Sequence, residues 1–228
     1  MTARATLMLA IALSVVDVLL IIGNLVHLRV NGPREPVHQV FSSSVWNGYL
    51  DNSFPEMFGF AQLVGAVVAL GFVWSDRRAG VYLAWMVVLL VVLADDLLQL
   101  HERGGATLVG SLDLPAIAGL RAQDLGELAV WASFAVALAP ALLVTHVRAS
   151  PVDRRNSWIV SGGIAVLAVA GVVVDLLDIA LVPLVPAVVS TGVTVLETTG
   201  ELVATTVLAV SAFAMAMRSA VPARPPAA

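Results

Sequence analysis

The chain has 228 residues, of which 59% are hydrophobic and only 12% are charged, and its mean hydropathy is +0.94. A soluble domain has about 45–50% apolar and about 25% charged residues, so this composition excludes an ordinary soluble fold. Cysteine and lysine are both absent, which excludes disulfides, thiolate metal ligands and Schiff-base chemistry. We therefore expect an all-α polytopic integral membrane protein with the lipid bilayer as its main partner. A net charge of −4 gives no reason to expect a nucleic-acid partner.

Six apolar runs follow one another along the chain, and each is long enough to cross a hydrocarbon layer of about 30 Å as a helix. They predict one transmembrane domain, residues 1–228, with a short tail at 218–228. The first run contains Asp17 and has no clear small-x-small cleavage site, so we expect an uncleaved helix and not a signal peptide. The predicted helices cover about residues 5–28, 57–74, 81–102, 124–147, 158–182 and 188–217.

The arginines predict the orientation in the membrane, because positive residues gather in cytoplasmic loops. One side would carry eight of them: Arg4, Arg77, Arg78, Arg148, Arg154, Arg155, Arg218 and Arg224. The other side would carry four: Arg29, Arg34, Arg103 and Arg121. This bias favours cytoplasmic termini in a plasma or inner membrane. The Ala, Val and Arg bias of the chain is typical of a bacterial genome rich in G and C.

The connections at 29–55 and 104–123 are longer than the others and would lie outside the cell. The first contains aromatic residues of the kind that settle at lipid headgroups. The second is apolar and contains glycine, which is compatible with a surface helix or a re-entrant turn. Neither reads as a separate domain.

Three helix starts have the spacing of a capping box. In this motif two residues three positions apart each accept, through their side chains, a hydrogen bond from the other's backbone amide. These are Ser53 with Glu56, Asp124 with Glu127, and Ser150 with Asp153. For Glu56, Asp124 and Glu127, capping is at least as good an explanation as function.

A faint repeat relates three parts of the chain. Asp17, Asp96 and Asp175 are separated by 79 residues in each case, and each stands in a similar apolar context. Gly126-Glu127-Leu128 and Gly200-Glu201-Leu202 resemble each other on the following helices. The pattern favours three helical hairpins in parallel orientation, although chance similarity between Leu-rich and Val-rich helices competes with this reading.

The acids inside the predicted helices are the most informative feature of the sequence. A carboxylate at mid-membrane costs about 2.5–3.5 kcal/mol even on the lenient insertion scale, so several of them need compensation. All twelve basic residues are arginines near helix ends, in loops or in tails. Compensation is therefore expected from protons or from a bound divalent cation.

The leading hypothesis is a transporter that binds a divalent cation, or relays protons, at an intramembrane carboxylate cluster. Oxygen ligands favour Ca²⁺, Mn²⁺, Mg²⁺ or Fe²⁺ over Zn²⁺ or Cu⁺. A membrane metalloenzyme with a carboxylate-bridged metal and a non-catalytic subunit of a membrane complex are the alternatives. His101 is adjacent to the acids but projects away from Asp95 on an ideal helix. The candidate ligands are Asp17, Asp95, Asp96, His101, Glu102, Asp175, Asp178, Glu197 and Glu201.

Overall fold

The structure is a computed structural model that describes residues 2–29, 36–117, 119–182 and 184–220. This part of the chain is helical and contains no strand. Six of its helical segments are long and apolar enough to cross a membrane, which confirms the expected all-α six-helix bundle. The orientation in the membrane and the kind of membrane stay predictions.

The spanning segments are close to the expected ones except that the third ends earlier and the fifth begins at Pro151, seven residues before its expected start. They are α1 (Thr2–Arg29), α3 (Phe54–Arg77), α4 (Gly80–Leu98), α6 (Ala122–Arg148), the continuous segment of α7 (Pro151–Ala168), η2 (Val169–Val174) and α8 (Asp175–Leu181), and α9 (Ala187–Ser219). Three short helices lie in the connections: α2 (Pro36–Phe41), η1 (Ser44–Trp46) and α5 (Leu100–Leu112).

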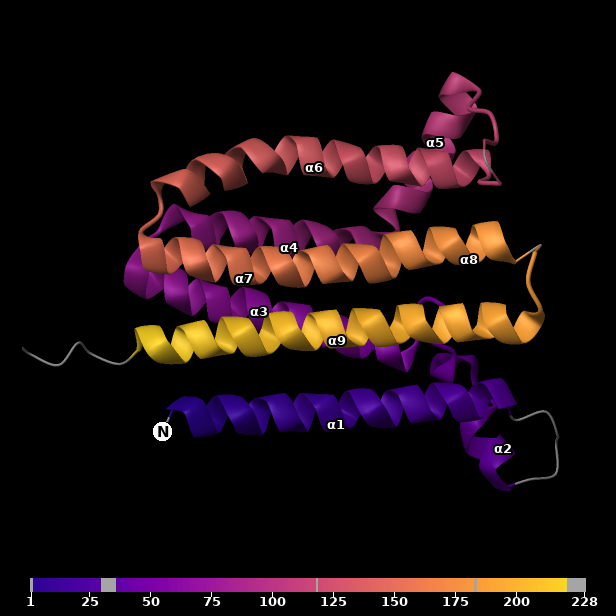
Figure 1. The fold of residues 1–228 in the computed structure, drawn as a ribbon, viewed down its shortest axis with the longest axis horizontal. Coiled ribbons are helices and arrows are strands. Elements are labelled where there is room, and N and C mark those ends of the chain that lie inside the picture. Colours follow the sequence, from indigo (N-terminus) through magenta and orange to yellow (C-terminus); the bar gives the residue numbers. More distant parts are fainter. Residues whose placement is uncertain (1, 30–35, 118, 183, 221–228) are drawn as a thin grey trace, which may run out of the picture.

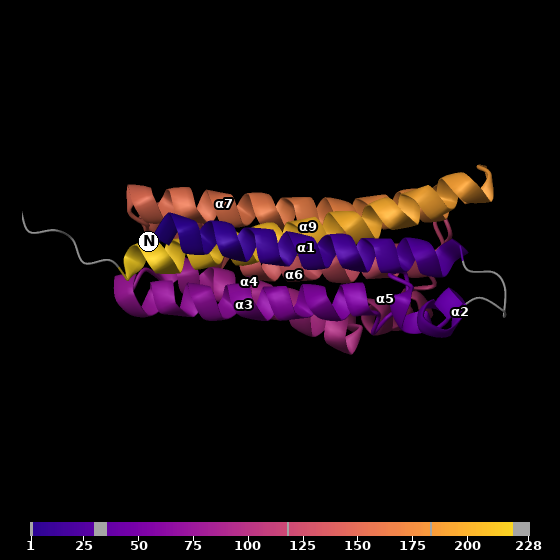
Figure 2. The ribbon, with the colours of Figure 1, turned by 90° about the horizontal axis from the view of Figure 1, so that it is seen from below.

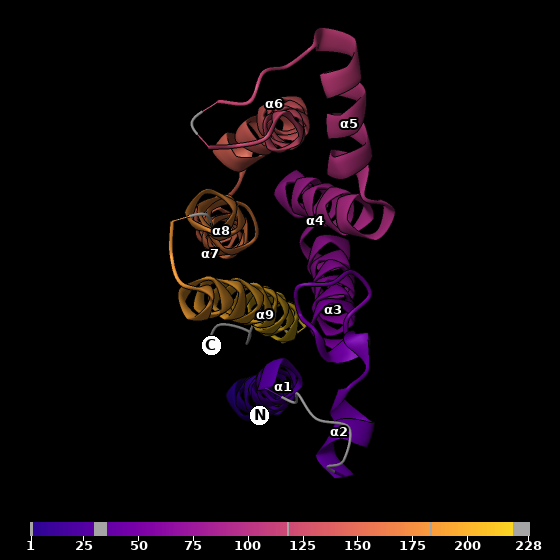
Figure 3. The ribbon, with the colours of Figure 1, turned by 90° about the vertical axis from the view of Figure 1, so that its right-hand side faces the viewer.

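The six spans form two rows, which are clearest when the bundle is viewed along its axis (Figure 3). The most extensive contact is between α3 and α9, and α1 and α7 both pack on α9. Helix α4 packs on α3, and α6 packs on α4 and α5. The start of α1 and the end of α9 lie at the same end of the bundle (Figures 1 and 2). We refer to the end that carries α5 as the α5 end, and to the opposite end as the Arg77 end.

The third span is shorter than expected. The prediction of one helix over 81–102 is wrong, because α4 ends at Leu98 and Gln99 adopts a left-handed conformation with φ 50° and ψ 46°. The chain turns there, and α5 runs across the end of the bundle (Figure 3). The second long connection thus contains a surface helix, one of the two possibilities expected. Because of the turn, helical periodicity across 95–102 does not describe which side chains share a face.

Two of the three expected caps are confirmed. Ser53 accepts a hydrogen bond from the amide of Glu56, and Ser150 accepts one from the amide of Asp153. The third prediction is wrong in its register, because the N-cap of α6 is Arg121, three residues before Asp124. Asp124 is the third residue of the helix and accepts from the Arg121 amide at 2.7 Å, while its other oxygen pairs with the Arg121 guanidinium at 2.6 Å. This arrangement satisfies the buried Asp124 carboxylate completely.

A π-helical turn, η2, separates α7 from α8 in the fifth span. π-Helical turns are rare in proteins, and those that occur are often found at functional sites. The turn lies against α9. An ideal Cβ atom on Gly171, inside η2, would lie 2.5 Å from Oε1 of Glu201, so a larger residue at this position would require the end of the Glu201 side chain to move. The local backbone is therefore matched to an acidic side chain of the neighbouring helix.

Candidate functional site

A cavity of about 1200 Å³ lies between the two rows of helices. Residues of α3, α4, α5, α6, α7, η2, α8 and α9 line it, together with the segment Gly48–Asp51. Its lining is divided chemically along the bundle axis. The part near the α5 end contains most of the carboxylates, and the part nearer the Arg77 end is formed by apolar side chains such as Val88, Leu138 and Ile164.

Four carboxylates of the spanning helices line the cavity without a side-chain partner. Within the part of the chain that the structure describes, their carboxylates accept no hydrogen bond and form no ion pair. For Glu197 the Oε2 atom is buried and unsatisfied. Buried acceptors of this kind are rare in native proteins and call for an explanation. The four are Asp96, Asp175, Glu197 and Glu201.

These four acids are also near enough to act on one another electrostatically. Asp96 and Asp175 both act on the charge of Glu201, and Glu201 and Asp175 act on that of Glu197. Like charges at short range oppose simultaneous ionisation unless a positive charge joins them. The arrangement therefore favours either bound protons or a bound cation.

Apart from Asp95, which pairs with His101, two of the predicted ligands lie outside this lining, and both are satisfied by protein groups. Asp17 is buried and accepts from Gln62 at 3.2 Å and from Thr206 at 2.7 Å. Asp178 accepts from the hydroxyls of Ser190 at 2.9 Å and Thr194 at 3.3 Å. Neither carboxylate needs a cation to explain its burial, so the structural data give both a packing role.

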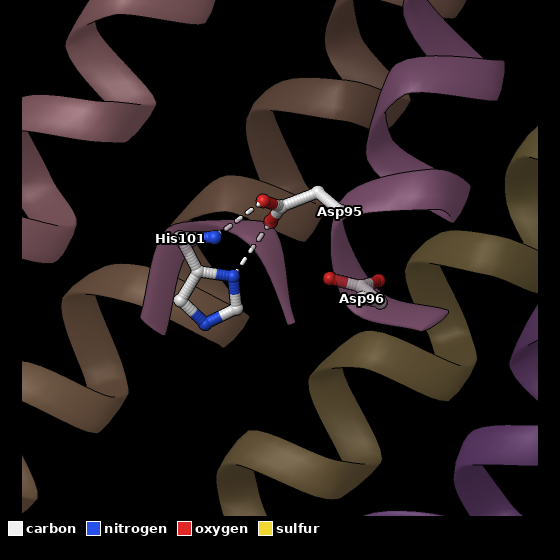
Figure 4. Close-up of side chains that lie close together, drawn as sticks. All are labelled: Asp95, Asp96 and His101. Atoms are coloured by element: carbon white, nitrogen blue, oxygen red, sulfur yellow. Dashed lines mark hydrogen bonds and ion pairs between the residues drawn. The ribbon is translucent and has the colours of Figure 1, made fainter. Parts of the chain in front are cut away.

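Asp95, Asp96 and His101 come together where α4 turns into α5 (Figure 4). One potential ligand atom of each lies within 4.8 Å of the other two, and among the described residues no other three His or acidic residues meet this criterion. Asp95 is completely buried and accepts from the His101 amide at 2.8 Å and from His101 Nδ1 at 2.7 Å. The expectation that His101 projects away from Asp95 is wrong, because the left-handed Gln99 redirects the chain.

The bond to Asp95 fixes the orientation of the imidazole ring. A carboxylate can only accept, so the hydrogen lies on Nδ1 and Nε2 is directed elsewhere. Burial opposes a charge on His101, but the bond to Asp95 and the charges of Asp95, Glu127 and Asp96 outweigh it and raise the pKa of His101 above its ordinary value near 6.5. The ring also stacks on Trp131 at 5.6 Å between centroids.

The remaining predicted ligand, Glu102, lines the cavity in the first turn of α5. Its backbone carbonyl accepts from Gln123 at 2.9 Å, and the same amide group donates to Glu127 at 2.7 Å. Helix α5 approaches α6 closely here. An ideal Cβ on Gly126 would lie only 2.6 Å from the Gly105 carbonyl oxygen, so the two glycines allow the contact. These contacts hold the α5 end of the cavity in place.

The sequence did not single out several residues that line the acidic part of the cavity. Glu56 and Glu127 were explained as caps, and both also line the cavity. Tyr49, from the first long connection, lines it as well, and desolvation together with the charges of Asp175 and Glu197 raises the pKa of Tyr49. Only the Gly-Glu repeat could have pointed to Glu127. Nothing in the sequence indicated Tyr49.

The Arg77 end of the bundle is closed by a network of polar side chains. Tyr82 donates to Asp153 at 2.7 Å and accepts from Asn156 at 2.8 Å, and Arg77 pairs with Asp153 at 2.5 Å. Beside it, Trp85 donates to Ser157 at 2.8 Å. The apolar part of the cavity ends at Trp85, so this network separates the cavity from the Arg77 end.

Residues 7–216 match the model of a family described as a domain of unknown function, DUF8692. This match covers most of the chain. The chain belongs to the DUF8692 family. No curated protein and no solved structure matches it.

In this family member, the geometry supports two kinds of chemistry at the α5 end of the cavity. His101 is held by Asp95 through Nδ1, and no described residue forms a hydrogen bond with its Nε2, which leaves that nitrogen available as a ligand atom. The unpartnered carboxylates on α8 and α9 provide negative charge for a positively charged ligand. The predicted hairpin repeat stays a prediction, although Glu127 and Glu201, which share the Gly-Glu-Leu pattern, both line the cavity.

Proposed function

We propose that this protein binds a divalent cation at the α5 end of its cavity, with the carboxylate of Asp96 and Nε2 of His101 as protein ligands. The pairing of His101 with Asp95 carries this proposal. Histidines that bind metals almost always donate their other ring hydrogen to a carboxylate or a carbonyl, which fixes the tautomer and makes the free nitrogen a better ligand. Asp95, completely buried, supplies that partner at 2.7 Å.

The composition of the site favours Mn²⁺ or Fe²⁺. Carboxylates suit Mg²⁺, Ca²⁺ and Mn²⁺, whereas imidazole suits Fe²⁺, Zn²⁺ and Cu²⁺. Mn²⁺ and Fe²⁺ accept both ligand types. The negative charge of Glu56 acts on both Asp96 and Glu201, and these nearby charges would add electrostatic attraction without supplying a closed ligand shell.

The site would serve transport of the cation. Residues of the Gly48–Asp51 connection line the cavity at the α5 end, and the Tyr82, Asp153 and Asn156 network closes the Arg77 end. Alternating access requires a state in which the site is closed toward one side of the membrane, and the polar network would provide that closure. Release at the Arg77 end would require this network to open.

Metal titration of the purified protein tests the binding proposal. Mn²⁺ added after chelator treatment should raise the melting temperature, and Asp96→Asn and His101→Gln should each reduce this increase by removing one ligand. Asp17→Asn provides the matched control, since it changes a buried acid outside the cavity. An equal response to Mn²⁺ in all four proteins, or no response in any, would contradict the proposed site.

Transport is tested separately in liposomes that contain the protein and a metal-sensitive dye. Mn²⁺ uptake by the unchanged protein, with loss in Asp96→Asn, is expected. If binding is confirmed but no flux occurs under an imposed Mn²⁺ gradient, the protein holds its cation without transporting it.

A further inference from the structure

A metal-ion site does not explain the apolar part of the cavity. A cavity of about 1200 Å³ exceeds the usual 300–1,000 Å³ of sites for organic ligands, whereas an ion and its ligands need a small fraction of that space. Apolar side chains also cannot coordinate a metal. Val88, Leu138, Leu142, Ile164 and Leu167 form this lining from three different helices. Such a surface is complementary to hydrocarbon.

The acidic wall formed by α8 and α9 also differs from a metal site. Asp175, Glu197 and Glu201 line the cavity, yet they do not meet the ligand spacing that Asp95, Asp96 and His101 meet. The buried Oε2 atom of Glu197 has no hydrogen-bond partner. An ammonium group is larger than a metal ion, donates several hydrogen bonds, and can join carboxylates that are too far apart to bind one ion.

We propose that the cavity binds a long-chain alkylammonium amphiphile, with its head at Glu197 and Glu201 and its hydrocarbon chain along the apolar lining toward Trp85. The proposal uses different ligands from the metal site and does not depend on it. The charge of the lining selects the class of head group. Eight carboxylates line the cavity, while Arg121, which also lines it, is paired with Asp124. An anionic head would meet repulsion there.

The dimensions of the cavity are suited to a single chain. Trp85 precedes Asp96 by eleven residues on α4, which corresponds to about 16 Å along the helix axis at 1.5 Å per residue. An extended undecyl chain is of comparable length. A head among the acids and a chain end at Trp85 would fill both chemically distinct parts of the cavity.

The packing of α6 provides a route for such a chain from the bilayer. Among the described residues, α6 packs extensively on α5 and α4 but only slightly on α7. Leu138 and Leu142 of α6 and Ile164 and Leu167 of α7 nevertheless line the same cavity. The side between α6 and α7 is thus weakly closed, and it faces lipid in a membrane. A hydrocarbon chain can enter there without crossing water.

Tryptophan fluorescence in lipid nanodiscs tests this proposal, with primary undecylammonium that carries bromine on the last carbon of its chain as the probe. Bromine quenches indole fluorescence at contact distance, and Trp85 would lie at the chain end. Saturable quenching is expected above the linear component that results from probe dissolved in lipid. Trp85→Phe should remove the saturable component, whereas Trp158→Phe, which removes an exposed indole outside the cavity lining, should retain it.

The head group is tested with variants and with matched probes. The double variant Glu197→Gln, Glu201→Gln should weaken saturable binding at least about tenfold, which corresponds to about 1.4 kcal/mol. Asp113→Asn, which removes an exposed acid from the same end of the protein, should leave it unchanged. The bromoundecyl alcohol and carboxylate should bind more weakly than the ammonium probe.

Equal saturable binding of the ammonium, alcohol and carboxylate probes would overturn the proposal, because the acids would then have no part in recognition. Absence of a saturable component in the unchanged protein would overturn it as well. Neither result would affect the metal proposal, whose measurement is the response to Mn²⁺ without any amphiphile. Failure of the Mn²⁺ response would equally leave the amphiphile result intact.

Discussion

Nδ1 of His101 lies 2.7 Å from Oδ2 of Asp95, a carboxylate with no exposed surface, although the two residues belong to different helices. Removal of one partner of a buried charged pair costs about 3–5 kcal/mol, because the other charge remains buried without compensation. His101→Ala should therefore lower the melting temperature substantially in chelator. Adding Asp95→Asn should restore part of the loss, and the double-mutant cycle measures the coupling. Additive effects of the two changes would show that the pair contributes no coupling.

The same pair predicts how stability depends on pH. The pKa of His101 is raised in the folded protein above the value of 6.5 expected for an unfolded chain. The stabilisation from its protonated form is thus complete below pH 6.5 and is lost as the pH rises through the raised folded value. In chelator, the unchanged protein should exceed His101→Gln in melting temperature most at pH 6, and the difference should shrink toward pH 9. A difference that increases with pH would contradict the assigned sign.

Gly171 lies close to a side chain of the neighbouring helix, whereas Gly162 of the same span does not. A Cβ atom there would lie 2.5 Å from Glu201 Oε1, whereas a Cβ on Gly162 would meet nothing within 4 Å. Gly171→Ala should force the end of the Glu201 side chain to move, and this cost should cancel the gain of about 1 kcal/mol that alanine brings to a helix. Gly162→Ala should retain this gain, as expected for alanine in a helix. Denaturant unfolding of both variants measures the contrast, and equal effects would contradict the close approach.

Replacing an acid by its isosteric amide should distinguish the acids that accept hydrogen bonds from protein groups from those that accept none. Asp17 accepts from two donors, Gln62 and Thr206, so in Asp17→Asn one donor would face the new amide hydrogens. A loss of about 1–3 kcal/mol is expected for a buried donor left unsatisfied. Glu201→Gln removes a charge that has no protein partner, so in chelator it should be neutral or stabilising. Melting temperatures for the two variants test this order, and the reverse order would contradict it.

The sequence by itself determined that the protein is a helical membrane protein. Runs such as that of α9, which continue for more than the thickness of a bilayer, leave no alternative for a backbone that must satisfy its own hydrogen bonds in lipid. It also identified the acids as the feature to explain, because charges in apolar runs are costly wherever the helices pack. The caps at Ser53 and Ser150 were predictable since they depend only on neighbouring residues.

Tertiary structure decided which acids share a site. Asp17 and Glu201 look alike in sequence, but Gln62 and Thr206, which satisfy Asp17, come from helices far along the chain. No local pattern encodes such partners. The Asp95 and His101 pair was hidden for another reason: a single left-handed residue, Gln99, ends the helical periodicity from which the facing of side chains was predicted. The cavity itself depends on how six helices pack, and therefore on contacts that sequence spacing does not specify.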